Sequence, residues 1–230
     1  MAPASVSREI PELTAEQQCQ LNAVLATLES DEHAPTAIRG RDEAARSHVA
    51  DSLVALELEA VRGASRIADL GSGAGFPGLA LAIALPPAEV FLVESQRRKC
   101  EFLERICTAA GVENAHVVCS RAEEWSEGAV RNDVVVARAL APQTVVLEYA
   151  APLLRIGGTL VDWRGRRDPS AERAAEQAAD LLGLHRQEIR RVTPFEDATD
   201  RHLHVFTKTA ETPSRFPRRA GMARKRPLAG

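Results

Sequence analysis

The chain has 230 residues, 45% of them hydrophobic, with a formal net charge of −3 and four cysteines that form no Cys-x-x-Cys pair. This length suits one large α/β domain with additions and is short for two full-sized domains. No apolar run approaches the roughly 20 residues needed to cross a bilayer, and the first residues lack a signal-peptide pattern, so we expect a cytoplasmic protein without membrane association.

The charge is unevenly spread along the chain. Residues 1–63 carry five Lys/Arg against eleven Asp/Glu, whereas residues 211–230 carry six Lys/Arg against Glu211 alone. A basic tail of this kind can follow phosphates, and it can equally be a disordered segment that keeps the protein in solution. Charge alone leaves both interpretations open.

In chain order, apolar positions first recur at helical spacing over residues 14–30 and 42–62, which predicts an N-terminal helical cap over residues 1–63. From residue 66 short apolar runs alternate with helical stretches, a pattern typical of a parallel sheet covered by helices. The predicted strands are 66–70, 89–93, 115–119, 133–137 and 158–162, and the predicted helices are 78–85, 96–110, 142–154 and 170–183.

The end of the chain departs from this alternation. Residues 186–192 and 202–207 are extended segments with no helix between them, so they should pair antiparallel at one sheet edge. We therefore expect a Rossmann-like α/β core over residues 64–210, followed by a basic tail over 211–230. The antiparallel ending favours a methyltransferase sheet over a dehydrogenase sheet.

A glycine-rich loop follows the first core strand, with Gly71, Gly73 and Gly75 after Asp69. Glycine permits positive φ and lets a ligand approach the backbone closely. Because the string from Gly73 to Gly78 also satisfies the dinucleotide fingerprint, the glycines alone leave NAD and S-adenosylmethionine open. The carboxylate at the base of the loop suits a cationic amino acid better than a diphosphate, and Asp69 can hold its ammonium group directly or through water.

The next two strands end near further candidate residues. Glu94 ends the second strand, where a carboxylate can accept both ribose hydroxyls, although a solvated strand-end carboxylate is the alternative. Ala122 and Glu123 follow the third strand and can bracket an adenine ring. The Tyr-x-x-x-Lys motif of an NAD-dependent oxidoreductase is absent, because Tyr149, the only tyrosine, is followed four residues later by Leu153. These features together favour S-adenosylmethionine.

Several segments resemble the RsmG (GidB) family, bacterial methyltransferases that act on N7 of a guanine in small-subunit (16S) ribosomal RNA. The matching segments are residues 48–53 (His-Val-Ala-Asp-Ser-Leu), the loop 69–78, residues 120–123, residues 137–139, and the tail from 215–221 through 227–228. The resemblance implies 16S ribosomal RNA or the small ribosomal subunit as partner, and it implies these contacts with S-adenosylmethionine: Gly71, Phe76, Ala122, Glu123 and Arg138, with Gly73 and Gly75 shaping the loop.

Two segments depart from the family pattern. The family's Asn-Leu-Thr before the second helix is Ala34-Pro35-Thr36 here, and its Lys-Gly after the fifth strand is Arg164-Gly165. Both lie on the side expected to face RNA. Arginine still suits a phosphate, but its planar fork changes the geometry of the contact.

Guanine N7 carries a lone pair and no proton, so its methylation needs no general base, and we expect no catalytic acid or base. The residues after the fourth strand agree, because they lack the Asn/Asp-Pro-Pro-Tyr/Phe tetrapeptide of amine methyltransferases. Positioning should supply the rate. Arg138 and Arg164 are the candidates to reach the guanine O6 or a phosphate. Asp51 is the candidate for the N1–H and N2–H₂ edge, or else it makes a hydrogen bond within the cap or between cap and core.

Other classes remain as alternatives: an RNA-binding assembly factor, which the complete loop and Glu94 disfavour, and a small-molecule methyltransferase, which the tail and Arg138 disfavour. His202 and His204 alternate along a predicted strand without a Cys or carboxylate at ligand spacing, so we expect no metal site. We expect a monomer.

Overall fold

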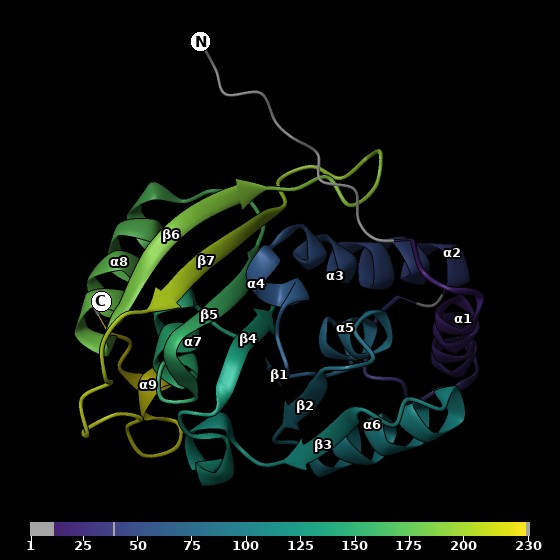
Figure 1. Ribbon diagram of the computed structural model, residues 1–230, viewed down its shortest axis with the longest axis horizontal. Helices are drawn as coiled ribbons and strands as arrows, with labels where there is room; N and C mark the ends of the chain where they lie inside the picture. Colours follow the sequence, from purple (N-terminus) through teal and green to yellow (C-terminus); the bar gives the residue numbers. More distant parts are fainter. Residues whose placement is uncertain (1–11, 39, 229–230) are drawn as a thin grey trace.

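The computed structural model describes residues 12–38 and 40–228, and it contains a seven-stranded sheet in the order β3-β2-β1-β4-β5-β7-β6 (Figure 1). The first five strands are parallel, and β7 runs antiparallel between β5 and β6. The predicted Rossmann-like fold and its antiparallel edge are confirmed. The strands are β1 (Arg66–Leu70), β2 (Glu89–Glu94), β3 (Ala115–Cys119), β4 (Asn132–Arg138), β5 (Leu154–Arg164), β6 (Leu184–Arg191) and β7 (His202–Lys208).

Helices cover both faces of this sheet, and each face has its own apolar core. One core joins the sheet to α1 (Ala15–Ser30), α5 (Gly78–Ala84), α6 (Arg97–Ala110) and the N-terminal cap. The other joins it to α7 (Gln143–Ala150), α8 (Pro169–Leu182) and α9 (Met222–Lys225), which lie together on the opposite side (Figure 1). No helix in the described ranges is long and apolar enough to span a membrane.

The second helical region of the cap is broken where the sequence predicts one helical stretch over 42–62. It consists of α2 (Arg41–Ala44), a π-helical segment η1 (Ala45–Ala50), α3 (Asp51–Leu53), a 3₁₀ segment η2 (Val54–Glu57) and α4 (Glu59–Arg62). Side chains compete for its backbone carbonyls: the Ser52 hydroxyl donates to the His48 carbonyl at 2.5 Å, and Trp163 Nε1 of β5 donates to the Asp51 carbonyl at 2.8 Å. Such π segments often accompany functional sites.

Strand β5 begins at Leu154, earlier than the predicted start at residue 158, and α7 ends at Ala150 rather than residue 154. The register of β5 with β4 shifts near its start, and Gly157 has a φ of +81°. The Gly157-Gly158 pair therefore lies at an irregularity inside β5, and not in a turn that precedes the strand.

Candidate cofactor and RNA-binding site

The glycine-rich loop connects β1 to α5 and needs glycine for its backbone. Gly71, Gly73 and Gly75 have φ of +71°, +56° and +99°, a region that side chains other than glycine adopt at a cost. A Cβ on Gly71 would also lie 2.5 Å from Leu140 Cδ1. The loop is thus shaped by positive φ and by close packing against the segment that follows β4.

Asp69 lies beneath this loop. Its side chain is fully buried, and its Oδ2 accepts a hydrogen bond from the Gly78 N–H at 3.0 Å. Burial raises the pKa of the Asp69 carboxyl to about 6. Asp69 is not among the described residues that line the cavities next to the loop. The Asp69 carboxylate therefore holds the start of α5. Of its two expected contacts with the ammonium group of a ligand, direct or through water, the contact through water stays a prediction.

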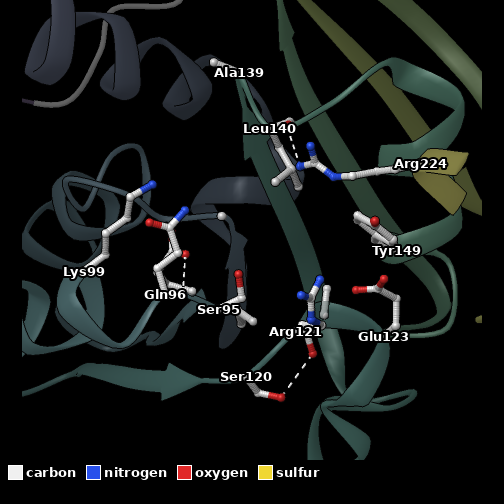
Figure 2. A pocket seen from close by; sticks show the side chains of 14 residues that line it. Ser95, Gln96, Lys99, Ser120, Arg121, Glu123, Ala139, Leu140, Tyr149 and Arg224 are labelled. Carbon is white, nitrogen blue, oxygen red and sulfur yellow. Dashed lines mark hydrogen bonds between the residues drawn. The ribbon is translucent and has the colours of Figure 1, made fainter. Parts of the chain in front are cut away.

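A first cavity of about 210 Å³ lies over the carboxyl ends of β2 and β3 (Figure 2). Glu94 lines it and is buried; its Oε2 accepts from the Gly73 N–H at 3.2 Å and its Oε1 from the Gln96 N–H at 2.9 Å. Each carboxylate oxygen has two lone pairs, so both retain capacity for a hydroxyl donor. The cavity brings Glu94 together with three other residues predicted from the sequence: Gly71, Ala122 and Glu123.

A second, wider cavity of about 690 Å³ opens between the loop, the cap and the ends of β4 and β5. It shares Gly71, Lys99 and Ala139 with the first cavity, so the two cavities are adjacent. Five more residues predicted from the sequence line this second cavity: Asp51, Gly73, Phe76, Arg138 and Arg164. The last predicted residue, Gly75, is not among the described residues that line either cavity.

Arg138, at the end of β4, ties the cap to the sheet. Its Nη1 donates to Asp51 Oδ2 at 2.8 Å and to the Ser47 carbonyl at 3.2 Å, and its Nη2 lies 3.2 Å from His48 Nδ1. A guanidinium can only donate, so His48 Nδ1 accepts, and Nε2 carries the proton that is shared with Thr36 Oγ1 at 2.9 Å. Burial and the charge of Arg138 lower the pKa of His48 to about 4, which keeps this ring neutral at pH 7.

The imidazole of His48 in turn stacks on the ring of Phe76, with centroids 4.8 Å apart and planes 9° apart. Phe76 is buried and belongs to the glycine-rich loop. The cap therefore orients the loop through an aromatic stack and through Arg138. In the segment Ala34-Pro35-Thr36, which departs from the family's Asn-Leu-Thr, Thr36 is the residue that contacts His48. Thr36 is also the residue of this segment that matches the family pattern.

Asp51 makes the cap-to-core hydrogen bond that was one of its two expected roles. Its other oxygen, Oδ1, is buried and has no hydrogen-bond partner among the described residues, although Arg201 Nε lies 3.5 Å away. The carboxylate thus retains an acceptor at the second cavity, and its contact with a base stays a prediction.

Arg164, at the end of β5, is held on two sides. Its Nε donates to Asp162 Oδ2 at 2.7 Å and its Nη2 to the Ala141 carbonyl at 3.0 Å. Asp162 is buried, which raises the pKa of its carboxyl to about 6 despite the adjacent guanidinium. The side chain of Arg164 is a quarter exposed, so it faces the cavity from a fixed position.

The histidines of β7 bind protein groups. His202 Nδ1 lies 2.8 Å from the Gly165 carbonyl, and His204 Nδ1 lies 3.2 Å from Gln143 Oε1. Within residues 12–38 and 40–228, no group of three His, Cys, Asp or Glu side chains is placed to hold a metal ion.

The family model of GidB, described as rRNA small subunit methyltransferase G, matches residues 17–203. The chain belongs to this family. Ribosomal RNA small subunit methyltransferase G of Syntrophomonas wolfei is 41% identical over 183 residues, which are 79% of this chain and 85% of that protein. The protein of the same name from Thermotoga neapolitana is 39% identical over 197 residues, 85% of each chain. The resemblance stated from the sequence is confirmed.

Solved structures support the fold. A mutant of MtNAS in complex with S-adenosylmethionine superimposes with a TM-score of 0.56 at 17% identity, over 84% of this chain and 73% of that one. A SAM-dependent O-methyltransferase from Thermotoga maritima gives 0.53 at 17% identity, over 70% of this chain and 65% of that one. At these identities the likeness concerns the fold alone.

Several residues that line the two cavities have no binding role predicted from the sequence. Lys99 lines both cavities, although its place near the start of α6 is also compatible with a solvated helix face. Arg201 precedes β7 and lines the second cavity, and Tyr149 and Arg224 line the first. No local pattern marks Arg201 or Arg224, because each reaches its cavity through contacts with residues more than 80 positions away.

Proposed function

We propose that this chain transfers the methyl group of S-adenosylmethionine to N7 of a guanine in 16S ribosomal RNA. The observation that carries the proposal is the pair of adjacent cavities that meet at the family's glycine-rich loop: the first extends to Glu94 and Glu123, and the second to Asp51, Arg138 and Arg164. The first cavity suits the cofactor and the second suits a base and its phosphates.

The residues of the first cavity fit S-adenosylmethionine. Gly71 lines the cavity with backbone atoms alone, which lets a ligand approach the main chain closely, and Glu94 offers lone pairs to ribose hydroxyls. Both nearby carboxylates, Glu94 and Asp69, suit a cationic ligand better than a diphosphate. When bound, S-adenosylmethionine supplies an electrophilic methyl group attached to a sulfonium sulfur.

The side chains of the second cavity suit a reaction that removes no proton before methyl transfer. His48 is the conventional candidate for a base, but Arg138 occupies its Nδ1 and Thr36 its Nε2. Arg138 and Arg164 are guanidinium groups and cannot accept a proton. The chain's contribution is therefore to hold the base in line, with Asp51 Oδ1 accepting from the guanine N1–H and N2–H₂ edge.

Positive charge around the second cavity suits a phosphate backbone. Arg164, Arg201 and Lys99 line it, and cations of this kind supply the salt-dependent part of RNA affinity. Arg138, which is largely buried and already bonded to Asp51, Ser47 and His48, acts mainly by positioning the loop and Asp51. We place the reaction in the cytoplasm, with the small ribosomal subunit or its free RNA as substrate and a single copy of the chain as the enzyme.

The test is to incubate the protein with S-adenosylmethionine tritiated on its methyl group in three separate reactions. The reactions contain small ribosomal subunits, naked ribosomal RNA or a metabolite pool. Label is expected in small-subunit RNA as 7-methylguanosine after nuclease digestion. Label in the metabolite pool alone would show that the substrate is a small molecule and not RNA. Absence of label from all three would favour an assembly factor that binds RNA without methylating it.

A further inference from the structure

The C-terminal segment, residues 213–228, folds back onto α7 (Figure 1). Glu148 of α7 is almost fully buried, and its carboxylate accepts from Arg218: Nε to Oε1 at 2.8 Å, Nη2 to Oε2 at 2.5 Å, and the backbone N–H to Oε1 at 3.2 Å. Phe216 and Ala223 are buried in the apolar core on that face of the sheet. This bidentate ion pair joins the half-buried Arg218 to the buried Glu148 and, with the apolar packing of Phe216 and Ala223, holds the segment in one place.

This anchored segment reaches the first cavity. The Gly221 N–H donates to Glu123 Oε1 at 3.0 Å, and Arg224 Nη2 donates to the Leu140 carbonyl at 2.9 Å. Tyr149 lines the cavity beside Glu123 and Arg224, and burial raises the pKa of its hydroxyl. Figure 2 shows Arg224, Tyr149 and Glu123 along one side of the cavity, across from Gln96 and Lys99.

We propose that the C-terminal segment forms one wall of the cofactor site, and that Arg224 contacts the adenosine part of S-adenosylmethionine. This inference rests on the proposed function. The assignment to adenosine follows from the other residues of the cavity, which lie at the ends of β2 and β3, with Glu94 placed for ribose hydroxyls and Ala122 and Glu123 beyond it. A guanidinium presents a flat face that packs against a planar ring, which an ammonium does not.

The segment thereby divides its cations between different tasks. Arg218 is committed to Glu148, Arg215 lies 5.1 Å from the ring of Phe216, and Arg224 faces the cavity. The remaining cations, Arg219, Lys225 and Arg226, are not among the described residues that line the two cavities; all three are exposed, as are Arg215 and Arg224. The basic tail, whose charge alone leaves an RNA contact and a solubilising segment open, therefore includes one residue that we assign to the cofactor site.

Isothermal titration of the full-length protein with two probes tests this wall. S-adenosylhomocysteine carries the adenosine and amino-acid parts of the cofactor, and 5′-methylthioadenosine lacks the amino acid. We expect Arg224→Ala and Arg224→Gln to raise the Kd of both probes by about 5- to 10-fold, as for the loss of a stacked, hydrogen-bonded guanidinium. The matched control is Lys225→Ala, which removes the neighbouring charge outside the cavity and should change either Kd less than about 2-fold.

Each other outcome counts against a stated part of the inference. Unchanged affinity in both Arg224 variants, with the wild type binding both probes, would overturn the wall. Weaker binding of S-adenosylhomocysteine alone would overturn the assignment to adenosine. Failure of the wild type to bind either probe would sink the proposed function itself. Melting temperatures of the same samples, unchanged from wild type, show that lost affinity reflects a lost contact.

Discussion

At the scale of single residues, the site depends on groups whose hydrogen-bonding capacity is almost fully used. Arg138 serves Asp51, Ser47 and His48 at once, so the guanidinium fixes the tautomer of the imidazole and the position of the carboxylate. Asp51 Oδ1 and Asp69 Oδ1 are exceptions, since both atoms are buried and have no hydrogen-bond partner in the described part of the chain. A buried acceptor without a donor costs free energy unless a ligand supplies one.

This leads to a prediction for Asp51→Asn. If Asp51 grips the guanine edge, the amide loses one acceptor and places a donor toward donors, so kcat/KM for RNA should fall by about 10- to 100-fold. The Kd of S-adenosylhomocysteine should change far less, because Asp51 lines only the second cavity. Asp42→Asn, an exposed carboxylate of the same cap, is the control. Methylation kinetics equal to wild type in Asp51→Asn would show that the residue only joins cap to core.

Gly71 allows a second prediction with a close control elsewhere in the chain. Gly71→Ala and Gly111→Ala both place alanine at positive φ, +71° and +62°, and each should lose about 1–2 kcal/mol of unfolding free energy. Only Gly71→Ala also drives a methyl group into Leu140, because nothing lies within 4 Å of a Cβ at Gly111. Cofactor affinity should therefore fall by roughly 10-fold or more in Gly71→Ala alone. Calorimetry on both variants measures this, and equal affinities would contradict it.

At the scale of elements, the sequence predicts regular structure well and tertiary irregularity poorly. Strands β1 and β3 have the predicted bounds and β2 ends one residue later, because each is a short apolar run between polar or glycine residues. The break in the cap is different. It depends on Trp163 of β5 taking the carbonyl of Asp51, a contact between residues 112 positions apart that leaves no periodic signal.

The same reasoning applies to the candidate site. The glycine-rich loop, Glu94 and Glu123 could be predicted, because the carboxyl ends of neighbouring parallel strands meet at one edge of the sheet. Arg224 and Arg201 could not, since their place depends on where the C-terminal segment and the turn before β7 fold back. The tail could be identified as basic, but the sequence does not show that Arg218 pairs with the buried Glu148.

The C-terminal segment carries an element-level prediction about RNA. Deleting it would uncover Phe216 and leave Glu148 buried without its partner, so substitution of exposed cations is the cleaner change. The triple variant Arg219→Gln, Lys225→Gln and Arg226→Gln should lower the slope of log Kd against log salt by about 2, at roughly 0.7 per lost phosphate contact on single-stranded RNA. Fluorescence anisotropy with ribosomal RNA at several salt concentrations measures the slope, and an unchanged slope would remove these cations from the RNA interface.

For the molecule as a whole, the fold explains why the two cavities lie next to each other at one edge of the sheet. The strand order reverses at β1, which lies between β2 and β4, and ligands of open α/β sheets bind at the carboxyl ends of the strands at such a switch point. The first cavity extends from β1 toward β2 and β3, and the second from β1 toward β4, β5 and the cap. In the proposed function, cofactor and substrate therefore approach from opposite directions and meet at Gly71, Lys99 and Ala139, which line both cavities.

Buried ionisable groups make opposite contributions to stability as the pH changes. Burial raises the pKa of Asp69 and Asp162 to about 6, so these carboxyls bind protons more tightly in the folded chain and favour folding as the pH falls from about 6 toward 4. Burial lowers the pKa of His48 and His204 to about 4, so the unfolded chain binds their protons more tightly and stability falls as the pH drops from about 6.5 toward 4. These contributions largely cancel in acid.

Replacing one histidine should reveal how much that histidine contributes to the pH dependence of the free energy of unfolding. His204 is buried in β7 against Gln143, outside the described residues that line the two cavities. Between pH 7.5 and pH 5 the wild type loses about 2 kcal/mol through His204, at 1.36 kcal/mol per pH unit below 6.5, and His204→Gln does not. The free energy of unfolding of the variant relative to wild type should therefore rise by about 2 kcal/mol over that range. Urea unfolding at both pH values measures it, with the exposed His185→Gln as the matched control. An equal difference at both pH values would mean that the imidazole is protonated in the folded chain as readily as in the unfolded one.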